Sequence, residues 1–394
     1  MLAIITFIIV LGLLVFVHEA GHFVVAKRAG MGVEEFGFGF PPRIIGIQKV
    51  DGRWRVMSRK PIADSRKQVA GGPTSTIYSL NWVPLGGFVR ITGENGGDTN
   101  DPRSFSAKPR WQRALVLVAG VAMNVVLAVS LFTAVYLFGA PQVLDGLPPG
   151  AKVRNQHTAI VGVLKDGPAV AAGFQPGDSV IAIDGQSFVN VLAVQQYIRE
   201  HTDRSLRITI EREGDQRVID VQPALLPGGT VTGIGVQLVE VGTVRFPPHL
   251  ALWYGIRTTG NVMVDILKAL GGLFRGLVVD HAVTVDIAGP VGIAVMTGQV
   301  VRLGFIHLLQ FTAVLSANLA LLNVFPFPAL DGGRLFLLGI EAIRRRALTR
   351  KIENAIHAAG FIVLLLLVVA VTYRDIVVFG GGILGSLKAA VGLE

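Results

Sequence analysis

Four long apolar segments constrain the fold of this 394-residue chain more than any other feature of its sequence. They lie at residues 1–26, 114–138, about 303–325, and 361–371 with its flanks. About 20 consecutive apolar residues can cross the hydrocarbon core of a bilayer as a helix, which satisfies its own backbone hydrogen bonds. The first segment could instead be a signal peptide, but it has no basic n-region and no A-x-A-like cleavage site. The sequence therefore predicts an α-helical polytopic membrane protein with about four transmembrane helices.

The overall composition agrees with a membrane protein, because 51% of the residues are hydrophobic, 16% are charged and the mean hydropathy is +0.56. The net charge of +9 comes from basic residues spread through loops beside the apolar segments, so we expect the lipid bilayer, and no nucleic acid, as a partner. Lysine and arginine are frequent between the first two spans and again after the third. Both loops are therefore predicted to be cytoplasmic, with the N-terminus and residues 140–300 on the outer side.

The motif HEAGH, at residues 18–22, places two histidines and a glutamate inside the first apolar segment. On a helix, His18 and His22 are one turn and roughly 6 Å apart, so both imidazoles can bind one zinc ion. In HExxH helices the glutamate, here Glu19, takes a proton from the attacking water. The pattern also occurs by chance, but each ionisable group buried in a span costs at least about 2.5 kcal/mol, which metal coordination offsets. About 26 Å of helix precede His18, so the motif is predicted within the membrane toward its cytoplasmic side.

Zinc requires a third protein ligand, and because the chain has no cysteine that ligand must be His, Asp or Glu. The metzincin spacing fails, since the position six residues after His22 is Arg28. Asp331 is the better candidate. It lies in NVFPFPALDGGR at the end of the third span, after two helix-breaking prolines and before two glycines that let backbone approach closely. Taken alone, LDGG is more typical of a helix-ending turn.

Other polar residues in or near the spans are predicted to have structural roles. Asn124, in the second span, is expected to hydrogen-bond a neighbouring helix. Three histidines lack metal-ligand spacing and are interpreted in the same way: His281, His307 and His357.

The sequence resembles the site-2 protease family of intramembrane zinc metalloproteases, specifically its bacterial RseP-like branch with an inserted PDZ domain. The segments that carry the resemblance follow one another along nearly the whole chain: HEAGH, FGFGFPPRI, NWVPLGGFVRITGEN, FSAKPRWQRALVLVAGVAMN, GPVGIA and SANLALLNVFPFPALDGGR. The combination of HExxH with N-x-x-P-x-P-x-L-D-G-G at this separation is far more specific than HExxH alone. One departure is Val121 in AGVAMN, where relatives usually carry proline, which bears on the local helix geometry.

The resemblance implies that His18, His22 and Asp331 are zinc ligands and that Glu19 is the catalytic base. Asn323 matches the family's polar residue near the scissile peptide, although hydrogen bonding between helices is an equally good interpretation.

The segment PLGGFVRITGE is predicted to form a β-hairpin, which in this family dips into the membrane near the active site. An extended substrate could then add to its edge by main-chain hydrogen bonds, with Gly86, Gly87 and Phe88 as the expected contacts. An ordinary cytoplasmic hairpin is the alternative.

A β-rich domain is predicted between the second and third spans. Its expected strands are AIVGVL, DSVIAIDG, SLRITIER and RVIDVQPAL, with one helix at about 191–199. GPAVAAGFQPGDSVIAIDGQSF looks like the core of a bacterial PDZ domain, which binds extended peptides or C-termini by strand addition, or serves as a packing or gating module. Four residues are expected at its turns: Gly173, Gly177, Asp178 and Gly185.

The chain is thus expected to comprise four regions. Residues 1–139 form the first half of a membrane protease core, 140–245 an extracytoplasmic PDZ domain, 246–300 an amphipathic segment at the membrane surface, and 301–394 the second half of the core. Trp253 and Tyr254 of the amphipathic segment are expected at the level of the lipid headgroups.

The leading functional prediction is a zinc endopeptidase of the bacterial inner membrane that cleaves transmembrane segments of single-span proteins in regulated intramembrane proteolysis. Anti-sigma factors and remnant signal peptides are the substrate classes that the resemblance implies. A non-catalytic PDZ scaffold is one alternative, but it would not need Glu19. A metal or proton transporter is another, but it predicts polar residues in further spans, and these are scarce.

Overall fold

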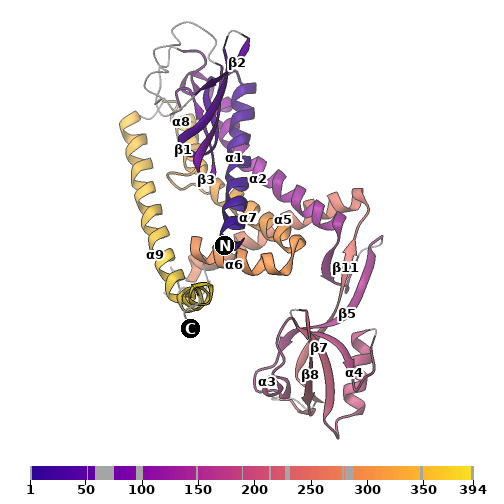
Figure 1. The fold of residues 1–394 in the computed structure, drawn as a ribbon. Helices are drawn as coiled ribbons and strands as arrows, with labels where there is room; N and C mark the ends of the chain where they lie inside the picture. Colours follow the sequence, from indigo (N-terminus) through magenta and orange to yellow (C-terminus); the bar gives the residue numbers. More distant parts are fainter. Residues whose placement is uncertain are drawn as a thin grey trace. The chain divides into compact units, whose positions relative to one another are not determined.

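The structure of the chain is a computed structural model that describes residues 2–50, 52–57, 75–94, 101–147, 150–188, 190–212, 214–226, 231–276, 279, 288–346 and 349–391. The chain divides into two compact units, one formed by residues 1–133 and 254–394 and the other by residues 134–253. Figure 1 shows the helices and strands of both units. His281 lies outside the described residues.

Four helices in the described part of the chain are long and apolar enough to cross a membrane, which confirms the predicted number of spans. The first, second and fourth extend beyond their apolar runs, because helical backbone continues into the polar flanks, whereas the third stays within its predicted segment. The last helix exceeds its predicted core of 361–371 most, since Lys351 to Gly380 qualifies as a span. The spans lie in α1 (Leu2–Arg28), α2 (Arg110–Phe138), α7 (Phe305–Val324) and α9 (Arg350–Val391).

Besides two short helices in the β-rich domain, three helices in the described part of the chain are too short or too polar to qualify as spans: α5 (Pro248–Arg275), α6 (Pro290–Leu303) and α8 (Asp331–Arg344). The amphipathic helix predicted after the β-rich domain is α5. The start of α6 is held by Asp375 of α9, a buried carboxylate that accepts hydrogen bonds from the main-chain N–H groups of Gly289 (3.2 Å) and Gly292 (2.7 Å). This contact satisfies an acid that would otherwise be unpaired within a span.

Helices α1 and α2 approach each other closely because small residues lie where they meet. A Cβ atom added to Gly21 would overlap the main chain of Ala119. Close approach at small residues is a common way to pack helices in lipid. Helix α2 continues without a break through Val121, which is buried, so the missing proline leaves the helix regular at this point.

A small antiparallel sheet packs against α1. Its strands, in the order β2-β1-β3, are β1 (Val33–Val50), β2 (Arg53–Met57) and β3 (Ile77–Ile91). The ribbon formed by β1 and β3 folds over on itself, so that Glu35 is paired with both Arg90 and Ile77. Gly39 and Gly86 lie near the bend with φ of 79° and 124°, which favour glycine. The sequence predicted a β-hairpin formed by PLGGFVRITGE, whereas residues 84–91 belong to the single strand β3, which pairs with the distant strand β1. The fold leaves the last part of β3 at an edge of the sheet.

The second unit is built on a six-stranded antiparallel sheet with the order β4-β11-β5-β6-β7-β8. The four strands and the one helix predicted from the sequence are present, whereas β4, β11 and the short helix α3 were not predicted individually. The elements are β4 (Ala140–Val143), β5 (Lys152–Val163), α3 (Pro168–Ala172), β6 (Ser179–Ile183), α4 (Val191–Glu200), β7 (Leu206–Arg212), β8 (Asp215–Val221), β9 (Ala224–Leu225), β10 (Thr232–Gly233) and β11 (Val236–Arg245).

A buried ion pair stabilises the turns of this unit. Arg212 donates to both carboxylate oxygens of Asp178, at 2.6 and 2.7 Å, and also to the carbonyl of Gly173 at 2.9 Å. Gly173, Gly177 and Gly185 all have positive φ, which is why glycine occupies these predicted turn positions. Burial alone would raise the pKa of Asp178, but the hydrogen bonds from Arg212 and from the main-chain N–H of Gln175, together with the nearby positive charges, outweigh it and hold that pKa below its usual value.

Candidate metal centre

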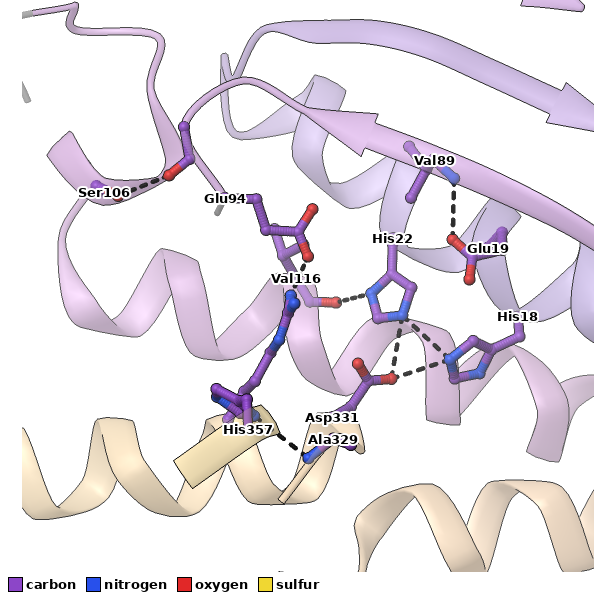
Figure 2. A network of polar contacts seen from close by, with 12 residues as sticks. His18, Glu19, His22, Val89, Glu94, Ser106, Val116, Ala329, Asp331 and His357 are labelled. Carbon is purple, nitrogen blue, oxygen red and sulfur yellow. Dashed lines mark hydrogen bonds and ion pairs between the residues drawn. The ribbon is translucent and has the colours of Figure 1, made fainter. Parts of the chain in front are cut away.

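Two histidines of α1 and one carboxylate from a segment more than 300 residues away converge within the first unit. His18 Nε2 lies 2.9 Å from Asp331 Oδ2, and His22 Nε2 lies 3.2 Å from the same oxygen. The two Nε2 atoms are 3.2 Å apart. Figure 2 shows the Asp331 carboxylate directed at both imidazoles. Both histidines are buried, so the cluster is largely shielded from solvent.

The spacing of these three atoms fits zinc. Tetrahedral zinc with bonds of about 2.0–2.1 Å holds its ligand atoms about 3.3 Å apart. The observed separations of 2.9–3.2 Å lie within a few tenths of an ångström of that value. Gly120 of α2 leaves room for the rings, since a Cβ atom there would collide with His22 Nε2 and would lie 2.8 Å from His18 Cε1.

Helix α2 also orients both imidazoles. His22 Nδ1 lies 2.8 Å from the main-chain oxygen of Val116, so Nδ1 carries the proton and Nε2 keeps its lone pair for a metal. Asn124 hydrogen-bonds a neighbouring helix, as predicted, and its partner is His18. Its side-chain nitrogen is placed 3.2 Å from His18 Nδ1, while Asn124 Oδ1 is buried without a partner among the described residues. Exchanging the amide oxygen and nitrogen makes Oδ1 the acceptor for His18 Nδ1–H, which frees His18 Nε2 in the same way.

The carboxylate of Glu19 is hydrogen-bonded to the small sheet. Its Oε2 accepts a hydrogen bond of 3.1 Å from the main-chain N–H of Val89, in the edge strand at the end of β3 (Figure 2). Because this N–H points toward α1, it takes no part in the ladder with β1. The base predicted from HExxH is therefore tied to the strand on which substrate contacts were predicted.

The loop that presents Asp331 is tightly packed. Any Cβ atom at Gly332 or Gly333 would overlap main-chain atoms of the segment 324–328, which is why glycine occupies both positions. Arg334, one turn into α8, forms an ion pair with Glu94, just beyond the end of β3. The helix that begins at Asp331 is thereby linked to the sheet.

The predicted substrate-contact residues lie at two places. Gly86 and Gly87 are buried at the bend of β3, where added Cβ atoms would meet Val15 and Phe16 of α1, and Phe88 is the next residue of the strand. Asn323 is half-buried in the last turn of α7. Within the described residues its side chain forms no hydrogen bond, so the interpretation as a link between helices finds no support.

Sequence reasoning missed the roles of Gly120 and of two main-chain groups, the carbonyl of Val116 and the N–H of Val89. Gly120 and Asn124 are four residues apart in an apolar span, and that spacing puts both on one helix face. This was the available signal. Backbone groups have no signature of their own in a sequence.

An HExxH helix in an apolar span, with a carboxylate from a distant segment beside both imidazoles, is typical of a membrane metalloenzyme. A sequence model of peptidase family M50 matches residues 6–60 and 68–367. The chain therefore belongs to peptidase family M50 and is a multi-pass membrane zinc metalloprotease, which confirms the resemblance to site-2 proteases, the enzyme class and the metal predicted from the sequence.

Individual relatives agree with the family. The zinc metalloprotease RasP of Geobacillus kaustophilus is 32% identical over 95% of this chain and 97% of its own length. RasP of Bacillus licheniformis is 30% identical over 95% of this chain and 98% of its own. Among solved structures, the PDZ domain of an SdrC-like protein from Listeria monocytogenes aligns over 22% of this chain and 92% of its own, at 26% identity and a TM-score of 0.20.

Proposed function

We propose that this chain is an intramembrane endopeptidase that cleaves transmembrane segments of single-span proteins, with His18, His22 and Asp331 as zinc ligands and Glu19 as the catalytic base. The observation that carries the proposal is the convergence of three ligand atoms within 4.8 Å of one another, two of them on a helix long and apolar enough to span a bilayer. A site at that depth meets peptide bonds that lie within the membrane.

Each protein group has a distinct task in this mechanism. Zinc, when bound, polarises a peptide carbonyl and lowers the pKa of water. Glu19 accepts the proton of the attacking water and returns it to the leaving nitrogen. The N–H of Val89 orients the Glu19 carboxylate, while Val116 and Asn124 fix the ring orientations of His22 and His18.

Substrate must be unwound before it can be cut, because the peptide groups of a helix are closed by their own hydrogen bonds. We assign this task to the edge strand of β3, where an extended segment adds beside Gly86, Gly87 and Phe88. The support is the proximity of that strand to the base, since Val89 lies one residue beyond Phe88. Asn323, whose side chain is free of other partners within the described residues, then binds the substrate backbone near the scissile bond.

The remaining assignments follow from charge and composition. The loops rich in lysine and arginine support an active site within the inner membrane, toward its cytoplasmic side. They also support an extracytoplasmic location for the second unit. We assign that unit as a PDZ domain for an extended peptide or C-terminus, on the basis of its antiparallel sheet and two helices. Helix α5 is assigned to the membrane surface, where Trp253 is 59% exposed. Anti-sigma factors and remnant signal peptides are the proposed substrates.

The test is cleavage of a model single-span substrate by the purified chain in liposomes. Wild type is expected to cut within the transmembrane segment. Glu19→Gln is expected to bind zinc normally and to lose cleavage by a factor of about 10²–10⁴, the usual contribution of a general base. Glu34→Gln, at an exposed carboxylate outside the site, is the matched control and should cut normally. Equal cleavage by wild type and Glu19→Gln refutes the mechanism.

Metal content tests the ligand set separately. Asp331→Ala is expected to lose zinc, because two imidazoles alone leave the ion without its third protein ligand. Undiminished zinc in this variant moves the third ligand elsewhere. If the wild-type chain binds peptide but does not cleave the substrate, the result supports the non-catalytic scaffold. If zinc or protons cross the liposome membrane without cleavage, the result supports a transporter.

A further inference from the structure

The loop that carries Asp331 contains a conformation that needs external support. Ala329, two residues before Asp331, has φ of +79°, in the left-handed region that is unfavourable for a residue with a Cβ atom. Two prolines in the same segment, Pro326 and Pro328, have no N–H with which to brace it. Such a conformation persists only when its surroundings hold it.

Helix α9 supplies that support at two positions on one face. His357 Nδ1 accepts a hydrogen bond of 3.2 Å from the main-chain N–H of Ala329 (Figure 2). Three residues later, Gly360 is buried against Pro328, where an added Cβ atom would lie 2.7 Å from the Pro328 carbonyl carbon. Residues at this spacing lie on the same side of a helix, so the fourth span packs Gly360 against the loop and accepts a hydrogen bond from it at His357 Nδ1.

The tautomer of His357 follows from this contact. Because the Ala329 N–H is a donor, His357 Nδ1 must be unprotonated and the ring proton must be on Nε2. That Nε2 is buried and has no partner among the described residues. Within the described residues, the His357 ring therefore forms its hydrogen bond with the main-chain N–H of Ala329.

We propose that His357 is a positioning residue for the metal centre: by accepting the N–H of Ala329 it fixes the loop so that the Asp331 carboxylate meets the two imidazoles. The proposal rests on the proposed role of Asp331 as third ligand. It gives the fourth span, which carries no zinc ligand itself, a share in zinc affinity. It also replaces the purely structural interpretation of His357 drawn from its lack of metal spacing.

Two substitutions separate the hydrogen bond from simple packing. Asparagine places Oδ1 on the same atom, Cγ, that carries Nδ1 in histidine, so His357→Asn keeps an acceptor for Ala329. His357→Leu fills similar space without an acceptor. Loss of an outer partner of a metal ligand commonly lowers metal affinity about 10–100-fold.

The experiment measures zinc affinity of the full-length chain in detergent by competition with a chelator, and the visible spectrum of the cobalt(II)-substituted protein as a signature of ligand geometry. His357→Leu is expected to bind zinc about 10–100-fold more weakly and to show an altered cobalt spectrum. His357→Asn is expected to stay close to wild type in both. Gel filtration and helicity measured beforehand show whether each variant is folded.

His307→Leu is the matched control, because the hydrogen bond that His307 forms within the described residues is to the carbonyl of Leu303, at the end of α6, at 2.9 Å, and its loss should leave both readouts unchanged. Wild-type affinity in His357→Leu overturns the proposal, and so does an equal loss in His357→Asn and His357→Leu, since the acceptor would then be irrelevant. Asp331→Ala, measured alongside, tests the ligand set on its own. Full zinc affinity in that variant would refute the proposed function together with this inference, whereas a failure confined to the His357 variants would leave the proposed function standing.

Discussion

Replacing Gly120 with alanine adds one methyl group at the point where α2 meets both imidazoles. The new Cβ atom would lie 2.7 Å from His22 Cε1 and 2.8 Å from His18 Cε1, whereas ordinary contact begins at 3.4 Å. The His18 ring would therefore have to move by about 0.6 Å and the His22 ring by more than about 0.7 Å, since its Nε2 lies closer still, so both movements are at least about three times the 0.2 Å tolerance of zinc–ligand distances. We expect zinc affinity to fall at least about 100-fold, or about 2.7 kcal/mol, the upper end of what losing an outer partner costs.

The same substitution should not weaken the helix, because alanine is favoured over glycine in helices by about 0.8–1 kcal/mol. Gly339→Ala is the matched control, since Gly339 lies in α8 with nothing within 4 Å of an added Cβ atom. The assay is competition for zinc between the purified chain and a chelator, with thermal unfolding measured in parallel. If Gly120→Ala binds zinc as tightly as wild type and Gly339→Ala, then the geometry of α2 does not set the ring positions.

Two further predictions concern Asn124 and Asp178. Asn124→Asp keeps an acceptor facing His18 and should bind zinc about as tightly as wild type, whereas Asn124→Leu should lose about 10–100-fold in the same titration; equal losses would show that the amide donates instead. Asp178→Asn removes the buried negative charge that pairs with Arg212 and should destabilise the second unit by about 3–5 kcal/mol, measured by hydrogen exchange of residues 134–253 in the full chain. The pKa of Asp178 is lower in the folded unit than in the unfolded chain, so this stabilisation should be complete above about pH 4 and be lost as the pH falls through the folded pKa. A difference in stability between wild type and variant that stays constant down to about pH 2 would contradict the prediction.

Local patterns in the sequence were sufficient for the elements whose stability is local. The apolar runs predicted the spans because a lipid-exposed helix needs length and hydrophobicity and little else. HEAGH indicated two ligands because helical spacing fixes their relation within one turn. The position of Asp331 was also predictable, because a carboxylate at membrane depth is costly unless it is paired or binds a metal.

Contacts between distant segments were beyond the reach of such patterns. The ribbon of β1 and β3 folds over on itself, and alternation along either strand does not indicate which half of the other it will meet. The lack of metal-ligand spacing around His357 predicts a structural role, and in the structure its ring accepts the main-chain N–H of Ala329, two residues from a predicted ligand. A search for side-chain motifs overlooks contacts of this kind, because any residue offers the same backbone donor.

One face of α2 determines the geometry of both histidines, although α2 carries neither. The Val116 carbonyl, Gly120 and Asn124 follow one another at intervals of four residues, so they form a single stripe along the helix. The first accepts from His22, the second makes room for both rings, and the third contacts His18. A rotation of α2 about its axis would displace all three together, and the close approach of Gly21 to the main chain of α2 opposes such a rotation. Zinc affinity should therefore respond to substitutions that widen the contact between α1 and α2, even where they touch no ligand.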